Sequence, residues 1–103
     1  MKTPENCKNI EEIRKEIDNI DQEIINLIGK RFNYVKEIVK YKSPDKDSII
    51  AKNRYNKVIS DRKSWAEKHG LAPNVIEKIY KTLIDYFIKE EIEMVNNKKE
   101  ITK

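Results

Sequence analysis

The feature that most constrains this chain is an apolar stripe with heptad spacing near its N-terminus. Its members lie alternately three and four residues apart: Ile10, Ile13, Ile17, Ile20, Ile24, Leu27, Arg31, Tyr34, Ile38 and Tyr41. This spacing predicts one α-helix, and no proline interrupts it. Such a helix is roughly 50 Å long, whereas a compact domain of about 100 residues has a radius of gyration of only about 13 Å. A monomer cannot bury the stripe, so we expect a second chain to cover it.

The composition excludes several classes of protein. The 103 residues are 39% charged and 38% hydrophobic, which indicates one small domain. The single cysteine, Cys7, rules out an internal disulfide framework and favours a reducing compartment. No apolar run approaches the roughly 18 residues of a membrane span, and the N-terminus lacks a signal-peptide core. We therefore expect a cytoplasmic protein with no membrane partner.

The charge pattern argues against a nucleic-acid partner. The net charge is +4, and positive and negative residues are interleaved along the chain, which is typical of solvated helix faces. The cations are eighteen lysines and four arginines. Because lysine is the usual cation here, each arginine hints that a planar, bidentate group is needed.

The pattern predicts an all-α fold, a single domain over 1–103 with three helices. The expected elements are a long helix over about 9–42, a loop over 43–48, helices over about 49–68 and 74–96, and a polar tail over 97–103. We expect Gly70 to end the second helix and Pro73 to lie near the start of the third. The expected buried side chains are Ile50, Tyr55, Val58, Ile59, Trp65, Ala66, Ile76, Ile79, Tyr80, Leu83, Phe87, Ile88 and Val95.

Four charged residues occupy otherwise apolar helix faces, namely Arg31, Arg54, Arg62 and Glu91. A long side chain in such a place often reaches solvent or pairs with an opposite charge, and we expect this of Arg62, with its stem along Trp65.

Arg31 and Lys42 are harder to explain in that way. They lie eleven residues apart and so share a helix face with Val35 and Ile38, which would suit a small anion with a hydrocarbon body. Arg14 is about 25 Å from Arg31 along the helix, so it can join such a site only from a partner chain.

Other catalytic chemistry has little support in the sequence. His69 is the only histidine and precedes a helix-ending glycine, and Cys7 has no histidine near it. No spacing of His, Asp and Glu predicts a metal site.

Several short segments together resemble a known family. They are Met1-Lys2-Thr3-Pro4-Glu5 with Cys7, Ile13-Arg14 to Ile20-Asp21, Gly29-Lys30-Arg31 with Tyr34-Val35-Lys36, Lys42, Arg54, Trp65-Ala66-Glu67 and Gly70-Leu71. As a set, over nearly the whole chain, they are similar to the all-helical type II chorismate mutases. Within that family the likeness is to the isochorismate pyruvate lyases of salicylate and siderophore biosynthesis.

The resemblance implies an interlocked homodimer that binds a small dianion, isochorismate or chorismate, without a metal or cofactor. It implies that Arg14 enters from the partner chain while Arg31, Lys42 and Arg54 line the site, with Lys42 hydrogen-bonded to the ether oxygen. The apolar walls would be Val35, Ile38, Val58 and Ile88, and the 43–48 loop would be a mobile lid.

Two positions depart from the mutase pattern. The mutases commonly carry an acid three residues before the second-helix arginine, where this chain has Ala51, as the lyases do. This favours loss of pyruvate from isochorismate, with chorismate mutase activity as a side reaction. Glu91 stands where bacterial relatives usually have glutamine, so it must be protonated to donate the same hydrogen bond.

Two alternatives remain open. One is a dedicated chorismate mutase, against which Ala51 argues. The other is a non-catalytic helical dimerisation or nucleic-acid-binding module. The second would explain the heptads and the charge but not the placement of Arg31, Lys42 and Glu91.

Overall fold

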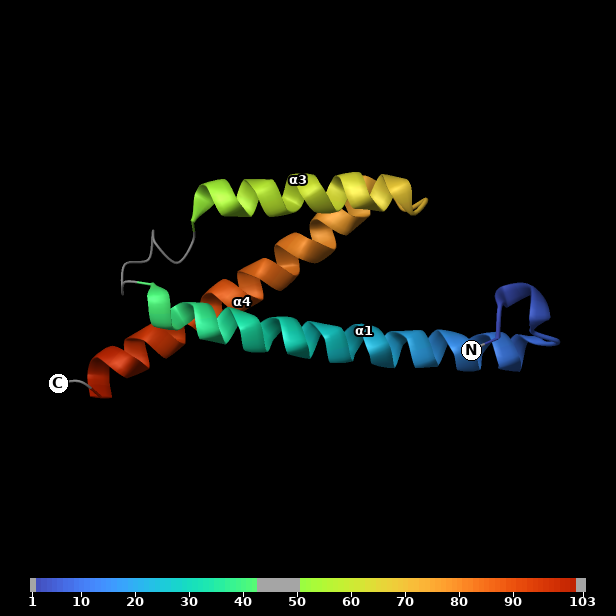
Figure 1. Ribbon diagram of the computed structural model, residues 1–103, viewed down its shortest axis with the longest axis horizontal. Coiled ribbons are helices and arrows are strands. Elements are labelled where there is room, and N and C mark those ends of the chain that lie inside the picture. Colours follow the sequence, from blue (N-terminus) through green and yellow to red (C-terminus); the bar gives the residue numbers. More distant parts are fainter. Residues whose placement is uncertain (1, 43–50, 102–103) are drawn as a thin grey trace. The chain divides into compact units, whose positions relative to one another are not determined.

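The computed structural model describes residues 2–42 and 51–101, with side chains as far as Asn97, and every regular element in this part is a helix (Figure 1). Its elements are the short 3-10 helix η1 (Pro4–Asn6), α1 (Ile10–Ile38), the 3-10 helix η2 (Val39–Tyr41), α3 (Lys52–Lys68) and α4 (Pro73–Ile101). The prediction of an all-α fold with three long helices is confirmed. The expected lid over 43–48 and the expected helix start at residue 49 lie outside the described residues.

The chain forms two compact units, with the boundary after Tyr34. The first contains η1 and most of α1, whose start is fixed by side-chain caps. Asn9 Oδ1 accepts a hydrogen bond from the Glu12 amide at 2.9 Å, and Glu12 Oε2 accepts one from the Lys8 amide at 2.8 Å. These satisfy two amides near the start of the helix. The Lys8 amide and the Lys2 ammonium together hold the pKa of Glu12 below its usual value.

The heptad stripe of α1 is exposed within this chain. Ile13 is 42% exposed, Ile20 44% and Leu27 52%, and the other apolar residues of the stripe are exposed to a similar or greater extent. A run of exposed isoleucines is unusual for an isolated soluble chain. The exposure agrees with the argument that a monomer cannot bury the stripe.

The second unit begins at Val35, and in it α3 and α4 are joined by a tight turn over 69–72 (Figure 1). The Leu71 amide donates to the Ala66 carbonyl and the Gly70 amide to that of Glu67. Gly70 has a φ of +72°, the left-handed conformation that this helix ending requires. Pro73 is the first residue of α4, so it leaves no amide unpaired. The predicted roles of Gly70 and Pro73 are both confirmed.

The α4 helix continues past the expected end at residue 96 and reaches Ile101. The polar tail expected over 97–103 is therefore helical for most of its length. Lysine and glutamate, which make up most of this segment, are good helix formers even where no apolar face needs burial. Polarity alone was a poor sign of a helix end here.

The core of the second unit is small. Its buried apolar side chains are Val39, Val58, Ile59, Ala66, Phe87 and Val95. Trp65 and Ile79 were expected to be buried, but they are 48% and 53% exposed in the single chain. Both lie on apolar faces that two helices alone do not cover.

Within the described residues, no helix is long and apolar enough to cross a membrane.

Candidate active site

The most distinctive polar feature is an ion pair between Lys42 and Glu91. Lys42 Nζ donates a hydrogen bond to Glu91 Oε2 at 2.8 Å, and the two side chains are only 19% and 7% exposed. The residues are 49 positions apart in sequence. The structure therefore brings together the two residues that the sequence predicts to be catalytic.

Local backbone structure places each partner. Lys42 follows the last turn of η2, where its amide donates to the Val39 carbonyl at 3.3 Å and its own backbone is extended. η2 packs on the C-terminal half of α4, with Val39 against Val95 and with Ile88, Ile92 and Met94 around them. This packing brings the end of η2 close to Glu91.

Glu91 lies in apolar surroundings. Among the described residues, Glu91 is the one charged residue that is buried, with 5% of its surface exposed. Its helical neighbours Phe87 and Val95 are buried, and Ile88 and Met94 are half-buried. A buried charge of this kind is costly unless a partner compensates it, and Lys42 is that partner.

Two further predicted residues lie on α3. Arg54 is exposed on the first turn and has no ion-pair partner among the described residues, while Val58, one turn later, is 4% exposed. Ala51 precedes the helix with a φ of +44°, and its carbonyl accepts from the Tyr55 amide at 3.0 Å. This left-handed backbone is strained for alanine, by roughly 1–2 kcal/mol.

The remaining predicted residues lie on α1. Arg14 is exposed and Arg31 is half-buried, both in the unit that ends at Tyr34. Val35 is half-buried and Ile38 is 47% exposed in the second unit, which also holds the half-buried Ile88 of α4. Arg31 lies seventeen positions after Arg14 on one continuous helix, about 25 Å away. The two cannot contact one small ligand within a single chain.

Arg62 is explained without a ligand. Its guanidinium carbon lies 4.5 Å from the centre of the Trp65 ring and 5.5 Å from that of Tyr80. Such stacking is a favourable cation–π contact. Trp65 is therefore the neighbour that was expected, but the guanidinium group lies over its ring, where the stem was expected to lie and the charged end to reach solvent.

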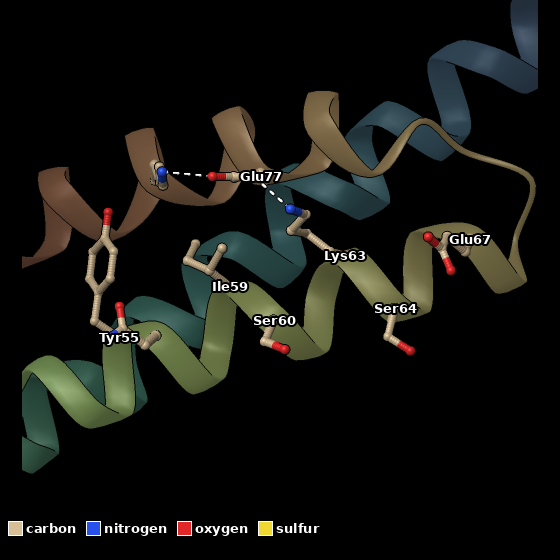
Figure 2. Close-up of a pocket in the computed structure, with 9 residues that line it drawn as sticks. Tyr55, Ile59, Ser60, Lys63, Ser64, Glu67 and Glu77 are labelled. Atoms are coloured by element: carbon tan, nitrogen blue, oxygen red, sulfur yellow. Dashed lines mark ion pairs between the residues drawn. The ribbon is translucent and has the colours of Figure 1, made fainter.

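A polar groove between α3 and α4, of about 500 Å³, contains none of the predicted site residues (Figure 2). Glu77 pairs there with Lys63 at 3.1 Å and with Lys81 at 2.7 Å. These contacts lower the pKa of Glu77, and Glu77 raises the pKa of Lys81. Burial, followed by the charge of Asp85, raises the pKa of the nearby Tyr55 hydroxyl.

This cluster was not predicted from the sequence. The spacing of Glu77 and Lys81 suggests an ion pair along one helix, but Lys63 joins them only through the packing of α3 on α4. With Glu67 also lining the groove, its charges cancel. The groove therefore lacks the excess positive charge that would attract an anion.

No three His, Cys, Asp or Glu side chains in 2–42 and 51–97 come together in a way that could hold a metal ion. What the site offers instead is a buried ammonium–carboxylate pair beside an apolar surface. In the same unit, Arg54 on α3 is exposed and has no ion-pair partner among the described residues. Such groups can bind carboxylates and stabilise charge that develops on an oxygen atom.

Comparison with known proteins gives consistent results. Residues 13–92 match the family described as chorismate mutase type II. The chain is 36% identical over 92 residues to the isochorismate pyruvate lyase of Pseudomonas aeruginosa, an alignment that covers 89% of this chain and 90% of that protein. It is 30% identical over 94 residues to the chorismate mutase of Methanocaldococcus jannaschii, covering 84% and 91%. A T-protein of Haemophilus influenzae is 33% identical over 70 residues, which is 19% of its length.

Proposed function

This chain belongs to the chorismate mutase type II family, and we propose that within it the protein is an isochorismate pyruvate lyase. The observation that carries the proposal is the 36% identity to the Pseudomonas lyase over nearly the full length of both chains. The reaction would split isochorismate into salicylate and pyruvate, with conversion of chorismate to prephenate as a side activity.

Ala51 supports the lyase over a dedicated mutase. A mutase of the family would carry an acid here, to contact the ring hydroxyl of its substrate. The backbone does not explain the absence of an acid, because aspartate tolerates the left-handed conformation at this position better than alanine does. A dedicated chorismate mutase is the second candidate, favoured by the 30% identity to the Methanocaldococcus enzyme.

Each charged residue of the proposed site has its own role in this reaction. The reaction is pericyclic, so it needs no nucleophile, metal or cofactor, only the reactive conformer and stabilisation of charge separation. Arg31 and Arg54, with Arg14 of the partner subunit, would bind the two carboxylates of the substrate through bidentate contacts. Lys42 and a protonated Glu91 would donate hydrogen bonds to the ether oxygen as the C–O bond breaks.

Apolar side chains would hold the ring of the substrate in place. We assign this role to Val35, Ile38, Val58 and Ile88. Val58 is buried, and Val35 and Ile88 are half-buried, so these three already belong to apolar surface, whereas Ile38 is exposed in the single chain.

The single cysteine and the match to a salicylate-forming enzyme fit a cytoplasmic role in making salicylate for a siderophore.

We also propose an interlocked homodimer, in which the α1 stripe of one chain is covered by the other. An obligate dimer is expected, because dissociation would return about 50 Å of apolar helix to water. Sedimentation at micromolar concentration, with helicity followed by circular dichroism, checks this. A folded, fully helical monomer would contradict it.

The test of function compares two substrates with one preparation. Purified protein is incubated with isochorismate and then with chorismate, and salicylate is followed by fluorescence and prephenate by chromatography. We expect kcat/KM for salicylate formation to exceed that for prephenate formation. Prephenate alone would select the dedicated mutase, and no turnover of either substrate would select a non-catalytic helical module.

A further inference from the structure

A small apolar hollow lies near the turn that joins α3 to α4. It holds about 190 Å³, and its lining includes Trp65, Leu71, Ile76 and Tyr80, with the cation Arg62 among them. Trp65 and Leu71 are 48% and 53% exposed, so apolar surface remains open here in the single chain. An apolar side chain from another molecule would fit this hollow.

Arg62 is a cation without a counter-charge. Its guanidinium group stacks on Trp65 and Tyr80, which holds its position but does not neutralise it. Arg62 forms no ion pair with an acid among the described residues, and its buried Nε atom has no hydrogen-bond partner there. A half-buried guanidinium group is stabilised by a carboxylate. The molecule that covers the hollow is therefore expected to bring an acid.

We propose that a second copy of this chain supplies both groups. Asp21 of the partner subunit pairs with Arg62, and Ile25 of the partner subunit packs against Trp65 in the hollow. The inference rests on the proposed interlocked dimer, in which Arg14 of the partner subunit reaches the substrate. It does not depend on which substrate is turned over.

The length of α1 decides which part of it can reach the hollow. In the proposed site Arg54 and Arg14 of the partner subunit bind the same small ligand, so α3 and the partner's α1 are close together there. From Arg54 to Trp65, α3 extends over eleven positions, about 16 Å. Only four residues of α1 precede Arg14, about 6 Å of helix, whereas twenty-four follow it as far as Ile38. Only the part after Arg14 is long enough.

Positions counted from the shared ligand bring an acid level with the unpaired cation. Asp21 lies seven positions after Arg14, about 10 Å along α1. Arg62 lies eight positions after Arg54, about 12 Å along α3. Both intervals are close to two helical turns, so each of these residues shares a helix face with the arginine that precedes it.

The same count brings two apolar residues level with each other. Ile25 follows Arg14 by eleven positions and Trp65 follows Arg54 by eleven positions, about three turns in each case. Ile25 is 69% exposed and lies outside the heptad stripe. Cover of the stripe alone therefore leaves Ile25 open, whereas the contact with Trp65 buries it.

The charges of the two helices also favour this contact. Over 10–25, α1 carries six acids and two cations, whereas α3 carries six cations and two acids. Asp21 is exposed and has no ion-pair partner among the described residues. Opposite net charges on two surfaces attract each other and disfavour other registers. A second copy therefore fits α3 better than a neutral or basic partner would.

Charge reversal tests the contact between copies. Asp21→Arg and Arg62→Asp variants are refolded together, and native mass spectrometry measures the fraction of heterodimers. In each homodimer both contacts bring like charges together, whereas the heterodimer has one native pair and one reversed pair. We expect about 80% heterodimers, where random pairing gives about half.

A substitution on the opposite face of α1 is the matched control. Glu23 is exposed and lies two positions after Asp21, so its side chain points away from the face of Asp21. Glu23→Arg makes the same change of charge, and mixed with Arg62→Asp it should give about half heterodimers. If Arg62→Asp folds poorly alone, a chain with both Asp21→Arg and Arg62→Asp should melt at a higher temperature than Arg62→Asp.

The outcomes separate this contact from the proposed function. About half heterodimers in the charge-reversed mixture, together with salicylate formation by the wild-type dimer, would overturn the contact and leave the function intact. That result is expected if Arg62 pairs with Asp21 of its own chain, or if another protein covers the hollow. A monomeric wild-type protein would overturn both this contact and the proposed dimer.

Discussion

Arg14→Ala and Arg31→Ala variants, each inactive alone, are expected to recover about a quarter of the wild-type activity when they are mixed and refolded together. Loss of either arginine should lower kcat/KM by at least about 100-fold, because each binds charge in the transition state. In an equal mixture about half of the dimers are heterodimers, and each of these has one site with both arginines. The measurement is the rate of salicylate formation before and after refolding.

The physical reason is the length of α1. Arg14 and Arg31 are about 25 Å apart on one continuous helix, so one substrate can contact both only if they come from different chains. A mixture of Arg31→Ala and Arg54→Ala is the matched control. Those two arginines are assigned to the same chain's site, so every heterodimer site lacks one of them and no recovery is expected.

Recovery in the control mixture would contradict the assignment of Arg31 and Arg54 to one chain. No recovery with Arg14→Ala and Arg31→Ala, in a preparation where heterodimers are shown to form, would mean that Arg14 is not donated across the interface.

The second large effect concerns the pH dependence of catalysis. The wild-type rate should fall about tenfold per pH unit once Glu91 remains ionised in the substrate complex. An ionised carboxylate cannot donate a hydrogen bond, and it places negative charge beside an oxygen that is gaining negative charge. The protonated form is the active one, so activity is present at low pH and is lost as pH rises.

Glu91→Gln should flatten this profile and retain or raise the rate at pH 8, because an amide donates at every pH. Glu91→Ala should lose rate at all pH values. The measurement is kcat against pH for the three proteins. If the Lys42–Glu91 pair has only a structural role, Glu91→Gln will lower the melting temperature and leave the shape of the profile unchanged. Superimposable wild-type and Glu91→Gln curves would therefore exclude the proton-donor role.

Much of the fold could be predicted because its signals are local. The heptad spacing predicted the long first helix, and Gly70 and Pro73 predicted the end of α3 and the start of α4. These signals depend on residues within one or two turns of each other. The end of α4 was misplaced because a polar sequence rich in lysine and glutamate remains helical without burial.

The site was predictable in its members but not in its contacts. The sequence predicted that Glu91 lies on an apolar helix face, and in the structure Glu91 is buried there. Its pairing with Lys42 spans 49 positions and depends on the packing of η2 on α4, which no local pattern encodes. The exposure of Trp65 and Ile79 was missed for a related reason, since apolar spacing indicates which face needs cover but not what covers it.

Product stoichiometry tests the central proposal most directly. Purified protein is given isochorismate at pH 7, and salicylate, pyruvate and remaining substrate are quantified over time, with an Arg31→Ala preparation as the blank. The proposed lyase yields one salicylate and one pyruvate for each isochorismate consumed, at a rate at least about 100-fold above the blank. Isochorismate that disappears no faster than in the blank, while chorismate is converted to prephenate, would contradict it.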